Sequence, residues 1–200
     1  MKKKIFVVLL IFIFVILVFC CYKFFIPGNN KIVKDVNELD EYILNIKNYN
    51  LEAKITVNSN KNTNTYFLKE SIQNGKQIQE IFGDNGEGIV LEYVEGNLTI
   101  KNTELKLSRI FDDYKNLLNN PIDFNSFIDD YKNDAKKEIK EKDNFYIISI
   151  KSKDLKNKYT TNKTLYFNRD ENKFKRVEIK DINNNLRIII EYSSFKLLWF

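Results

Sequence analysis

The chain has 200 residues, of which 44% are hydrophobic and 30% are charged, and it contains no histidine. This length and composition are typical of one globular domain with an additional N-terminal segment. Without histidine the chain can form no Ser-His-Asp or Cys-His catalytic arrangement and no histidine zinc site, which excludes most common hydrolytic mechanisms.

Residues 1–26 are expected to form a membrane anchor or signal segment. Lysines 2–4 precede an uncharged run from Ile5 to Tyr22, which as an α-helix would be about 27 Å long and could cross a bilayer. The first alanine is Ala53, so the run lacks the small-residue site at which secretory signals are cleaved. We therefore expect an uncleaved transmembrane helix, with the lysines in the cytoplasm and the rest of the chain outside the cell membrane.

Lipidation is the alternative form of membrane attachment. The two cysteines of the chain lie at the end of the apolar run, and Cys20 is the better lipidation candidate because Leu17 stands three residues before it. Lipoprotein signals carry a small residue directly before the modified cysteine, whereas Phe19 precedes Cys20. Since no cysteine follows residue 21, the outer domain has neither a disulfide nor a thiolate nucleophile.

The net charge of +5 is concentrated beside the membrane segment. Without Lys2, Lys3, Lys4 and Lys23, 28 basic residues remain against 27 acidic ones, which leaves a net charge of +1. A nearly neutral domain lacks the basic excess that binds phosphates, so nucleic acid is not an expected partner.

After a linker at residues 27–34, an extracytoplasmic domain is expected over residues 35–200. Its first element is a helix, in which Glu38 is placed to close a capping box with Asp35. The apolar residues with helical spacing are Val36, Leu39, Ile43 and Ile46.

From Leu51 the apolar period becomes two, which indicates a half-buried strand. Turn residues then recur at short intervals, at Asn74-Gly75 and at Glu95-Gly96-Asn97. Such short connections can join only antiparallel strands. The first half of the domain is therefore predicted to be a β-meander.

Two further helices are predicted in the middle, capped by Ser108 and Ser126. Their inward residues would be Ile110, Tyr114 and Leu117 in the first helix, and Ile128, Tyr131, Ala135 and Ile139 in the second. The charged run at residues 134–143 would form the solvated end of the second helix, with Glu138 and Lys142 paired one turn apart. Strands are expected to resume at residues 144–151, 160–168, 173–181 and 186–197.

These elements predict an α+β fold with a curved antiparallel sheet of about nine strands or more, a half-barrel packed on three helices. Its concave face would be either an open ligand cavity or a space filled by aromatic side chains. The abundance of aromatic residues, 16 Phe and 11 Tyr, favours the filled form.

No catalytic, cofactor-binding or metal-binding residue is expected. The acidic pairs Asp112-Asp113 and Asp129-Asp130 are interpreted as solvated helix starts, because adjacent residues of a helix do not aim at one bond. A glycan-cleaving enzyme is a further hypothesis, and it would need two acids from different elements facing one cleft.

The chain ends on apolar residues that include its one tryptophan, Trp199, followed by Phe200. An apolar end is expected to be buried against the open edge of the core. The alternative is that Trp199 and Phe200 form an anchor for a partner, since exposed aromatic residues concentrate binding energy.

The strand from Tyr49 to Val57, the following SNKNTNTY hairpin and the meander that ends at Leu98-Thr99-Ile100 resemble the GerS-type germination lipoproteins of spore-forming clostridia. The resemblance covers most of residues 35–197 in strand order and implies a fold of the LolA and RseB type. It also implies an anchored, non-catalytic protein of sporulation or germination that binds a partner such as a cortex-modifying cell-wall amidase, and it leaves a homodimer open. A carrier or sensor that holds acyl chains or lipoproteins in the half-barrel is the alternative.

Overall fold

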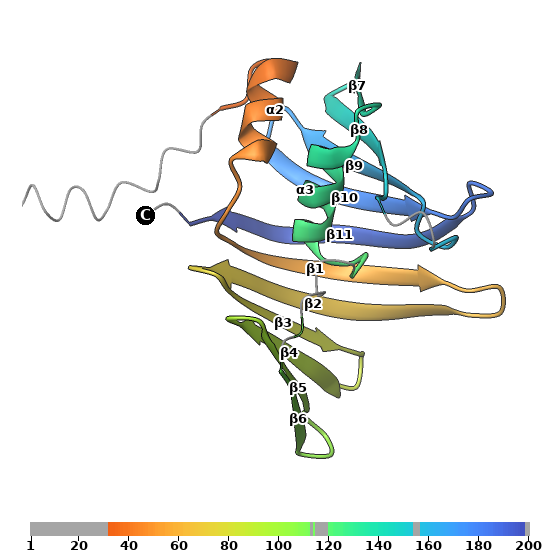
Figure 1. Ribbon diagram of the computed structural model, residues 1–200. Helices are drawn as coiled ribbons and strands as arrows, with labels where there is room; N and C mark the ends of the chain where they lie inside the picture. The colour runs from red at the N-terminus through yellow and green to blue at the C-terminus, as the bar shows by residue number, and fades with distance from the viewer. Residues whose placement is uncertain (1–31, 113, 115–119, 154–156, 199–200) are drawn as a thin grey trace, which may run out of the picture. The chain divides into compact units, whose positions relative to one another are not determined.

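The computed structural model describes residues 32–112, 114, 120–153 and 157–198. These ranges contain two helices and eleven strands (Figure 1). The helices are α2 (Val36–Leu44) and α3 (Phe124–Asn133). The strands are β1 (Tyr49–Asn58), β2 (Thr63–Gln73), β3 (Lys76–Phe82), β4 (Gly88–Val94), β5 (Asn97–Asn102), β6 (Leu107–Phe111), β7 (Glu138–Lys142), β8 (Phe145–Lys151), β9 (Asn162–Asn168), β10 (Lys173–Lys180) and β11 (Leu186–Leu197).

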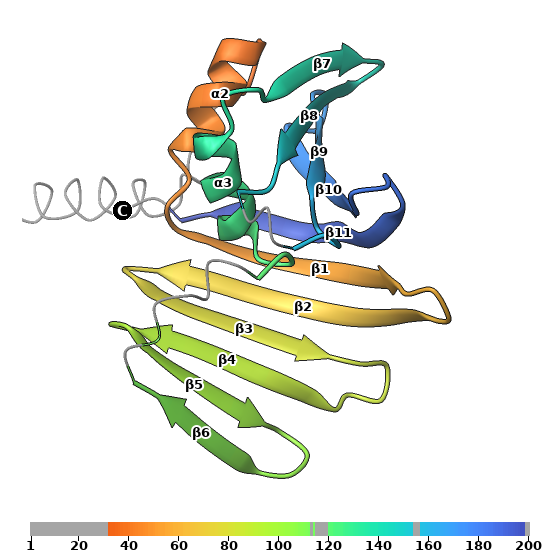
Figure 2. The same ribbon diagram turned by 45° about the vertical axis from the view of Figure 1, so that its right-hand side comes forward.

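All eleven strands form one antiparallel sheet in the order β6-β5-β4-β3-β2-β1-β11-β10-β9-β8-β7. The pairing of β1 with β11 joins two meanders, so β6 and β7 become the two edges of an open sheet. Figure 2 shows the half from β7 to β11 curling round the helices, whereas β1 to β6 continue as a twisted ribbon. The predicted curved half-barrel is confirmed, with eleven strands and, in the described residues, two helices where three were expected.

Helix α2 begins as the sequence predicts. The Asp35 carboxylate accepts the backbone N–H of Glu38 at 2.8 Å, and the Glu38 carboxylate in turn accepts the N–H of Lys34 at 2.8 Å. The first bond satisfies an N–H that the helix start would otherwise leave without a partner, and the second reaches the residue before the cap, one position from the N–H of Asp35 that a capping box uses. Leu39 and Ile43, one turn apart, are fully buried and hold the helix in the core.

Helix α3 begins before the predicted cap. The Asp123 carboxylate caps it by accepting the N–H of Asn125 at 2.8 Å, and the carboxylate charge also suits the positive end of the helix dipole. Ser126, the expected cap, lies buried inside the helix, where its Oγ accepts a hydrogen bond from Lys163 Nζ at 2.9 Å.

The helix predicted from Ser108 does not begin there, because Leu107–Phe111 form strand β6, and Leu117 lies outside the described residues. Lys106 adopts a φ of 52°, and this turn brings the chain back along β5. The apolar residues that suggested a helix are too few to distinguish the two periods.

The charged run at residues 134–143 is likewise not helical. Asp134 has an extended conformation that ends α3, and Asp143, with a φ of 52°, closes a tight turn between β7 and β8. The helical pair of Glu138 with Lys142 therefore does not form. Glu138 instead contacts Lys140 at 2.8 Å on the exposed surface of β7.

The hairpin predicted at Asn74-Gly75 is confirmed. Both residues have positive φ, 51° and 80°, as a two-residue turn between twisted strands requires. Glu95 and Gly96 repeat this geometry with φ values of 49° and 90°, and they join β4 to β5. Only the glycine of each pair adopts such a φ without steric cost.

Candidate functional site

Aromatic side chains fill the concave face beneath the helices. Phe124, the first residue of α3, is 1% exposed, and its ring lies 5.6 Å from that of Tyr49, 5.1 Å from Phe174 and 4.8 Å from Phe195. Further rings extend this cluster: Tyr42, Phe127, Tyr131, Tyr146, Phe167 and Tyr192. A filled interior favours a partner-binding protein over a carrier, which would keep this space open.

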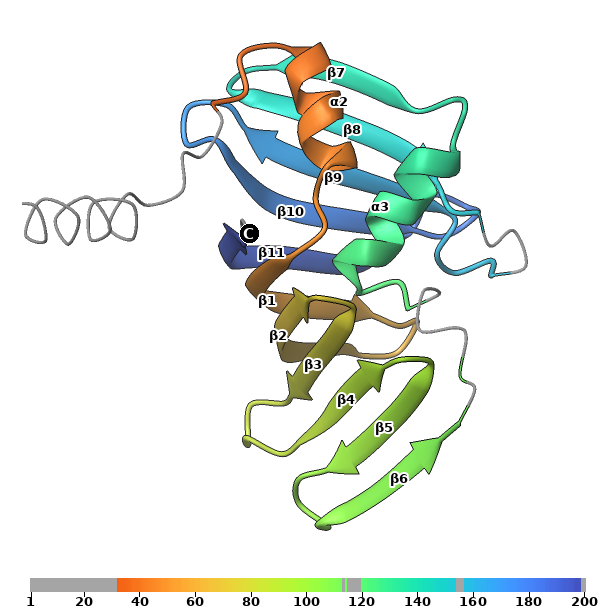
Figure 3. The same cartoon turned by 60° about the vertical axis from the view of Figure 1, so that its left-hand side comes forward.

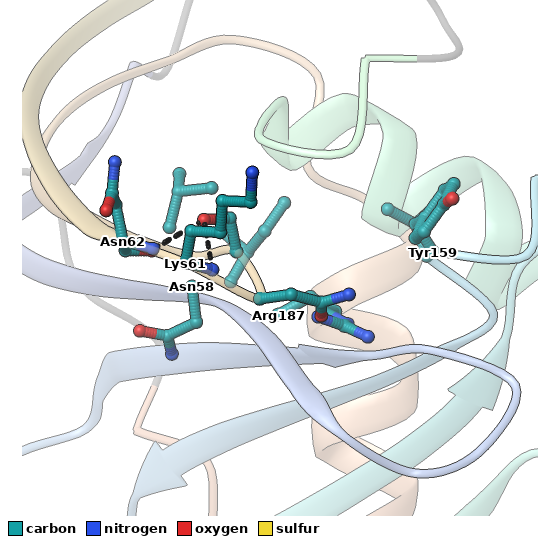
Figure 4. Close-up of a pocket in the computed structure, with 10 residues that line it drawn as sticks. Asn58, Lys61, Asn62, Tyr159 and Arg187 are labelled. Atoms are coloured by element: carbon teal, nitrogen blue, oxygen red, sulfur yellow. Dashed lines mark hydrogen bonds between the residues drawn. The ribbon is translucent and has the colours of Figure 1, made fainter.

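A pocket of about 590 Å³ lies at the end of the β1–β2 hairpin (Figure 4). Its floor is formed by Val57 and Ile188, which are paired across β1 and β11, and Tyr159 lies on the far side from the hairpin. The hairpin residues 58–62 form the rim, and they belong to the segment whose sequence resembles the GerS-type proteins. The volume is within the range of small-molecule sites.

The charge of Arg187, which lines this pocket, is already paired. Its guanidinium donates to Asp181 from Nε at 2.8 Å and to the side-chain oxygen of Asn60 from Nη1 at 2.7 Å. Burial alone would raise the pKa of Asp181, but hydrogen bonds from Asn185, Arg187 and Asn183 outweigh it and lower the pKa to about 2. Because Asp181 stays ionised and bound to Arg187, these two charges offset each other, and the pocket offers an apolar floor and a rim of amide side chains with the charged Lys61 among them.

The same side of the sheet is uncovered at its other end. Strand register places several apolar residues of β3–β6 on the helix side, and we call five of them the open face: Ile81, Ile89, Leu91, Ile100 and Leu107. Ile89 is 44% and Leu107 63% exposed, and the other three are half-buried. In the described part of the chain, no helix lies over this end of the sheet (Figure 3). A continuous exposed apolar patch is typical of a protein-binding surface.

A buried polar cluster joins the sheet to the start of α3. Glu70 Oε1 accepts hydrogen bonds from the Tyr49 hydroxyl at 2.8 Å and from Gln77 Nε2 at 3.0 Å, and the same Gln77 nitrogen donates to Asp123 at 3.0 Å. Burial and then the Asp123 carboxylate raise the pKa of Glu70 well above its usual range, although the hydrogen bond from Tyr49 opposes them. Glu70 therefore keeps its proton to a higher pH than an exposed glutamate does.

We expect Glu70→Gln to be more stable than the parent at pH 8, because the raised pKa of Glu70 makes the folded parent less stable as pH rises. In the unfolded chain Glu70 loses its proton near its ordinary pKa, so between that pKa and the higher folded one the folded state binds more protons, and stability falls as pH rises. Glutamine retains the acceptor for Tyr49 and Gln77 but cannot ionise. Thermal unfolding measured from pH 4.5 to 8 should show that the difference in stability between the variant and the parent decreases toward pH 4.5. Glu80→Gln, at an exposed position of β3, is the control, and equal profiles for both variants would contradict the account.

The expectation that both acids of the Asp129-Asp130 pair are solvated is wrong for Asp130. It is 3% exposed, and its carboxylate lies 2.7 Å from the ammonium of Lys163, which is 2% exposed. Its other oxygen accepts the backbone N–H of Lys153 at 2.9 Å. Asp129 is half-buried and pairs with the Lys153 side chain. The sequence offered one signal for this pair, since alternation places Lys163 on the same face as apolar Leu165.

Of the other predicted acidic pair, the structure describes one residue. Asp112 is exposed just after β6, and Asp113 lies outside the described residues. The acids that do come together, Glu70 and Asp123, are 2% and 1% exposed and so cannot face a glycan. In the described ranges, no group of three or more His, Cys, Asp or Glu side chains could hold a metal.

The predicted attachment residues remain untested. Cys20, Trp199 and Phe200 lie outside the described residues, as does the expected anchor at residues 1–26. Among the residues that the structure does describe, no helix combines the length and apolar character needed to span a bilayer. Strand β11 runs to Leu197, as predicted.

No protein-family model matches the sequence, and no curated protein matches it. Solved structures do match. In the structure of the CwlD amidase from Clostridioides difficile in complex with the GerS lipoprotein, GerS is 19% identical to this chain with a TM-score of 0.51, and the match covers 83% of this chain and 98% of that one. An uncharacterised conserved protein from Thermus thermophilus is 7% identical with a TM-score of 0.52, over 83% of this chain and 90% of that one. The expected GerS-type fold is thus confirmed.

Proposed function

We propose that this chain is a non-enzymatic, membrane-anchored protein of sporulation or germination that binds a protein partner, such as a cortex-modifying cell-wall amidase, on the extracytoplasmic side. The observation that carries the proposal is the fold it shares with GerS, a lipoprotein whose structure was determined in complex with the CwlD amidase. At this level of identity the likeness is one of fold, so the partner class is the part of the proposal that needs direct testing.

Two features of the structure support a binding role. The concave interior is filled by the cluster around Phe124, which leaves little room there for a carried molecule. The open face, by contrast, exposes apolar side chains such as Ile89 and Leu107 that a partner could cover. Trp199 and Phe200 are included as partner-binding candidates on the sequence argument alone.

Membrane attachment is part of the proposal and rests on the sequence of residues 1–26. Intact-mass measurement on the protein extracted from membranes should find a chain that retains this segment. A mature chain that begins with a lipid-modified Cys20 would replace the transmembrane anchor by a lipid anchor. A shorter chain without lipid would contradict membrane attachment altogether.

A carrier or sensor is the second candidate, because the pocket beneath the β1–β2 hairpin has an apolar floor and a volume of about 590 Å³. Native mass spectrometry of the purified full-length chain distinguishes the two functions. Co-purifying acyl lipid that is lost in Ile188→Trp, which would fill the pocket floor, supports the carrier. Protein without bound lipid supports the partner-binding function.

The partner class is tested by co-purification from sporulating cells. A tagged full-length chain, solubilised in mild detergent, should retain a cell-wall amidase that mass spectrometry identifies. A tagged variant that carries Ile89→Asp and Leu91→Asp on the open face should retain less of the amidase. If the parent, the double-aspartate variant and an empty resin all recover the same amount of amidase, the proposed partner is rejected.

A further inference from the structure

The two edges of the sheet differ in a way that their lengths do not explain. Strands β6 and β7 both have five residues, and within the described chain each pairs on one side only. Alternate residues of an edge strand turn their N–H and C=O groups away from the sheet, where another strand can bind them. Figures 1 and 2 show β6 as the outermost strand at its end of the sheet.

Strand β7 has the composition of a protected edge. Its sequence, EIKEK, has four charged residues in five, and all four are exposed. Charged side chains, especially lysine, prevent a second strand from pairing with an edge. The sequence of β6, LSRIF, contains one charge, and Leu107 and Ile110 are 63% and 64% exposed. Thus β6 lacks the protection that β7 has.

The charge on β6 is Arg109, at the centre of the strand. Its guanidinium lies 4.7 Å from the centre of the Phe111 ring, so it packs along the helix side of the sheet beside the open face. Arg109 makes no ion pair with any residue that the structure describes. A strand that paired with β6 would therefore meet one free positive charge, with apolar side chains on both faces of the sheet around it.

A second copy of this chain fits this edge poorly. If β6 of one copy paired antiparallel with β6 of a second copy so that all five residues overlapped, Arg109 would lie opposite Arg109 of the other copy. Like charges directly opposite each other destabilise a strand pair. A strand with an aspartate or glutamate at that position, flanked by apolar residues, would gain an ion pair and continue the apolar surface instead.

We propose that β6 is a docking edge onto which a partner protein adds an extended segment, with a carboxylate opposite Arg109 and apolar residues on either side of it. This inference rests on the proposed partner-binding function and specifies where and how the partner binds. Backbone hydrogen bonds to β6 supply the strength of the contact, and Arg109 with the neighbouring open face supplies its specificity.

The first test uses two matched double-lysine variants of the full-length chain in detergent. Leu107→Lys with Ile110→Lys gives β6 the charged character of β7. Leu105→Lys with Ile182→Lys is the control, because these residues are 61% and 59% exposed and lie outside the strands. Pull-down of the cell-wall amidase of the same organism should fall at least about tenfold for the first variant and stay near the parental level for the control.

The second test uses synthetic peptides of about ten residues, a length that covers an ordinary strand. Valine and threonine alternate around a central glutamate in one peptide and around a central lysine in the other. NMR titration of the parent should show the glutamate peptide binding about fivefold more tightly, and Arg109→Glu should reverse the preference.

The outcomes separate the docking edge from the proposed function. Equal amidase recovery by the parent and both double-lysine variants would overturn the docking edge and leave the function standing. Peptide binding with the expected preference, without amidase recovery by the parent, would support the edge and overturn the amidase. A parental dimer that Leu107→Lys with Ile110→Lys dissociates would show that a second copy occupies β6, which also overturns the proposal.

Discussion

Phe124→Ala should lower the free energy of unfolding by about 3–5 kcal/mol, the usual cost of removing a buried phenylalanine. The Phe124 ring lies at the centre of the aromatic cluster, 4.8 Å from Phe195 of β11 and 5.8 Å from Tyr192 of the same strand. Because this one side chain joins α3 to the middle of the sheet, its loss leaves a cavity that rigid strands cannot close. Urea denaturation of the purified protein measures the change.

Phe67→Ala is the matched control for this prediction. Phe67 is 36% exposed on the face of the sheet away from the helices, where it stacks on Phe82 at 5.7 Å. We expect this variant to lose about 1 kcal/mol, since most of its surface is already in water or shared with one ring. Equal losses at Phe67 and Phe124 would contradict a core centred on α3.

Lys163→Met should also destabilise the protein by about 3–5 kcal/mol, because it leaves the Asp130 carboxylate buried without a counter-charge. Methionine keeps most of the volume of lysine, so the loss reports on charge more than on packing. A double variant that adds Asp130→Asn to Lys163→Met removes the uncompensated buried charge and keeps an acceptor for the backbone N–H of Lys153. The double variant should therefore be more stable than Lys163→Met alone.

The comparison for this ion pair is the more exposed pair of Lys153 with Asp129, whose side chains are 42% and 30% exposed. Lys153→Met should cost less than about 1 kcal/mol, because solvent screens an exposed pair. Calorimetric unfolding of the single and double variants gives the coupling between Asp130 and Lys163. Coupling near zero would mean that the buried pair does not stabilise α3 against β9.

Most strands could be predicted because the two signals that define them, apolar alternation and turn residues, lie within short stretches of the sequence. Alternation over residues 186–197 gave β11 with its bounds, and the Asn74-Gly75 turn fixed the neighbouring hairpin. The segments at Ser108 and at residues 134–143 were misassigned because short runs with few apolar residues fit either period. Their strand character depends on β5 and β8, which lie beside them only in the folded sheet.

The buried polar groups and the docking edge could not be predicted in the same way. Glu70 and Lys163 each stand on an apolar face of a predicted strand, which marks them as unusual, but their partners Asp123 and Asp130 are distant in sequence. Which strand ends a sheet depends on the order of all the strands. The exposure of Arg109 therefore follows from topology alone, and no local pattern distinguishes it.

The most direct test of the account is a titration of the purified full-length chain, held in detergent, with the cell-wall amidase of the same organism. The account predicts a saturable complex at micromolar concentrations, and no peptidoglycan cleavage by the chain alone. A chain that binds no amidase at these concentrations, and that instead carries acyl lipid through purification, would contradict partner binding as its function.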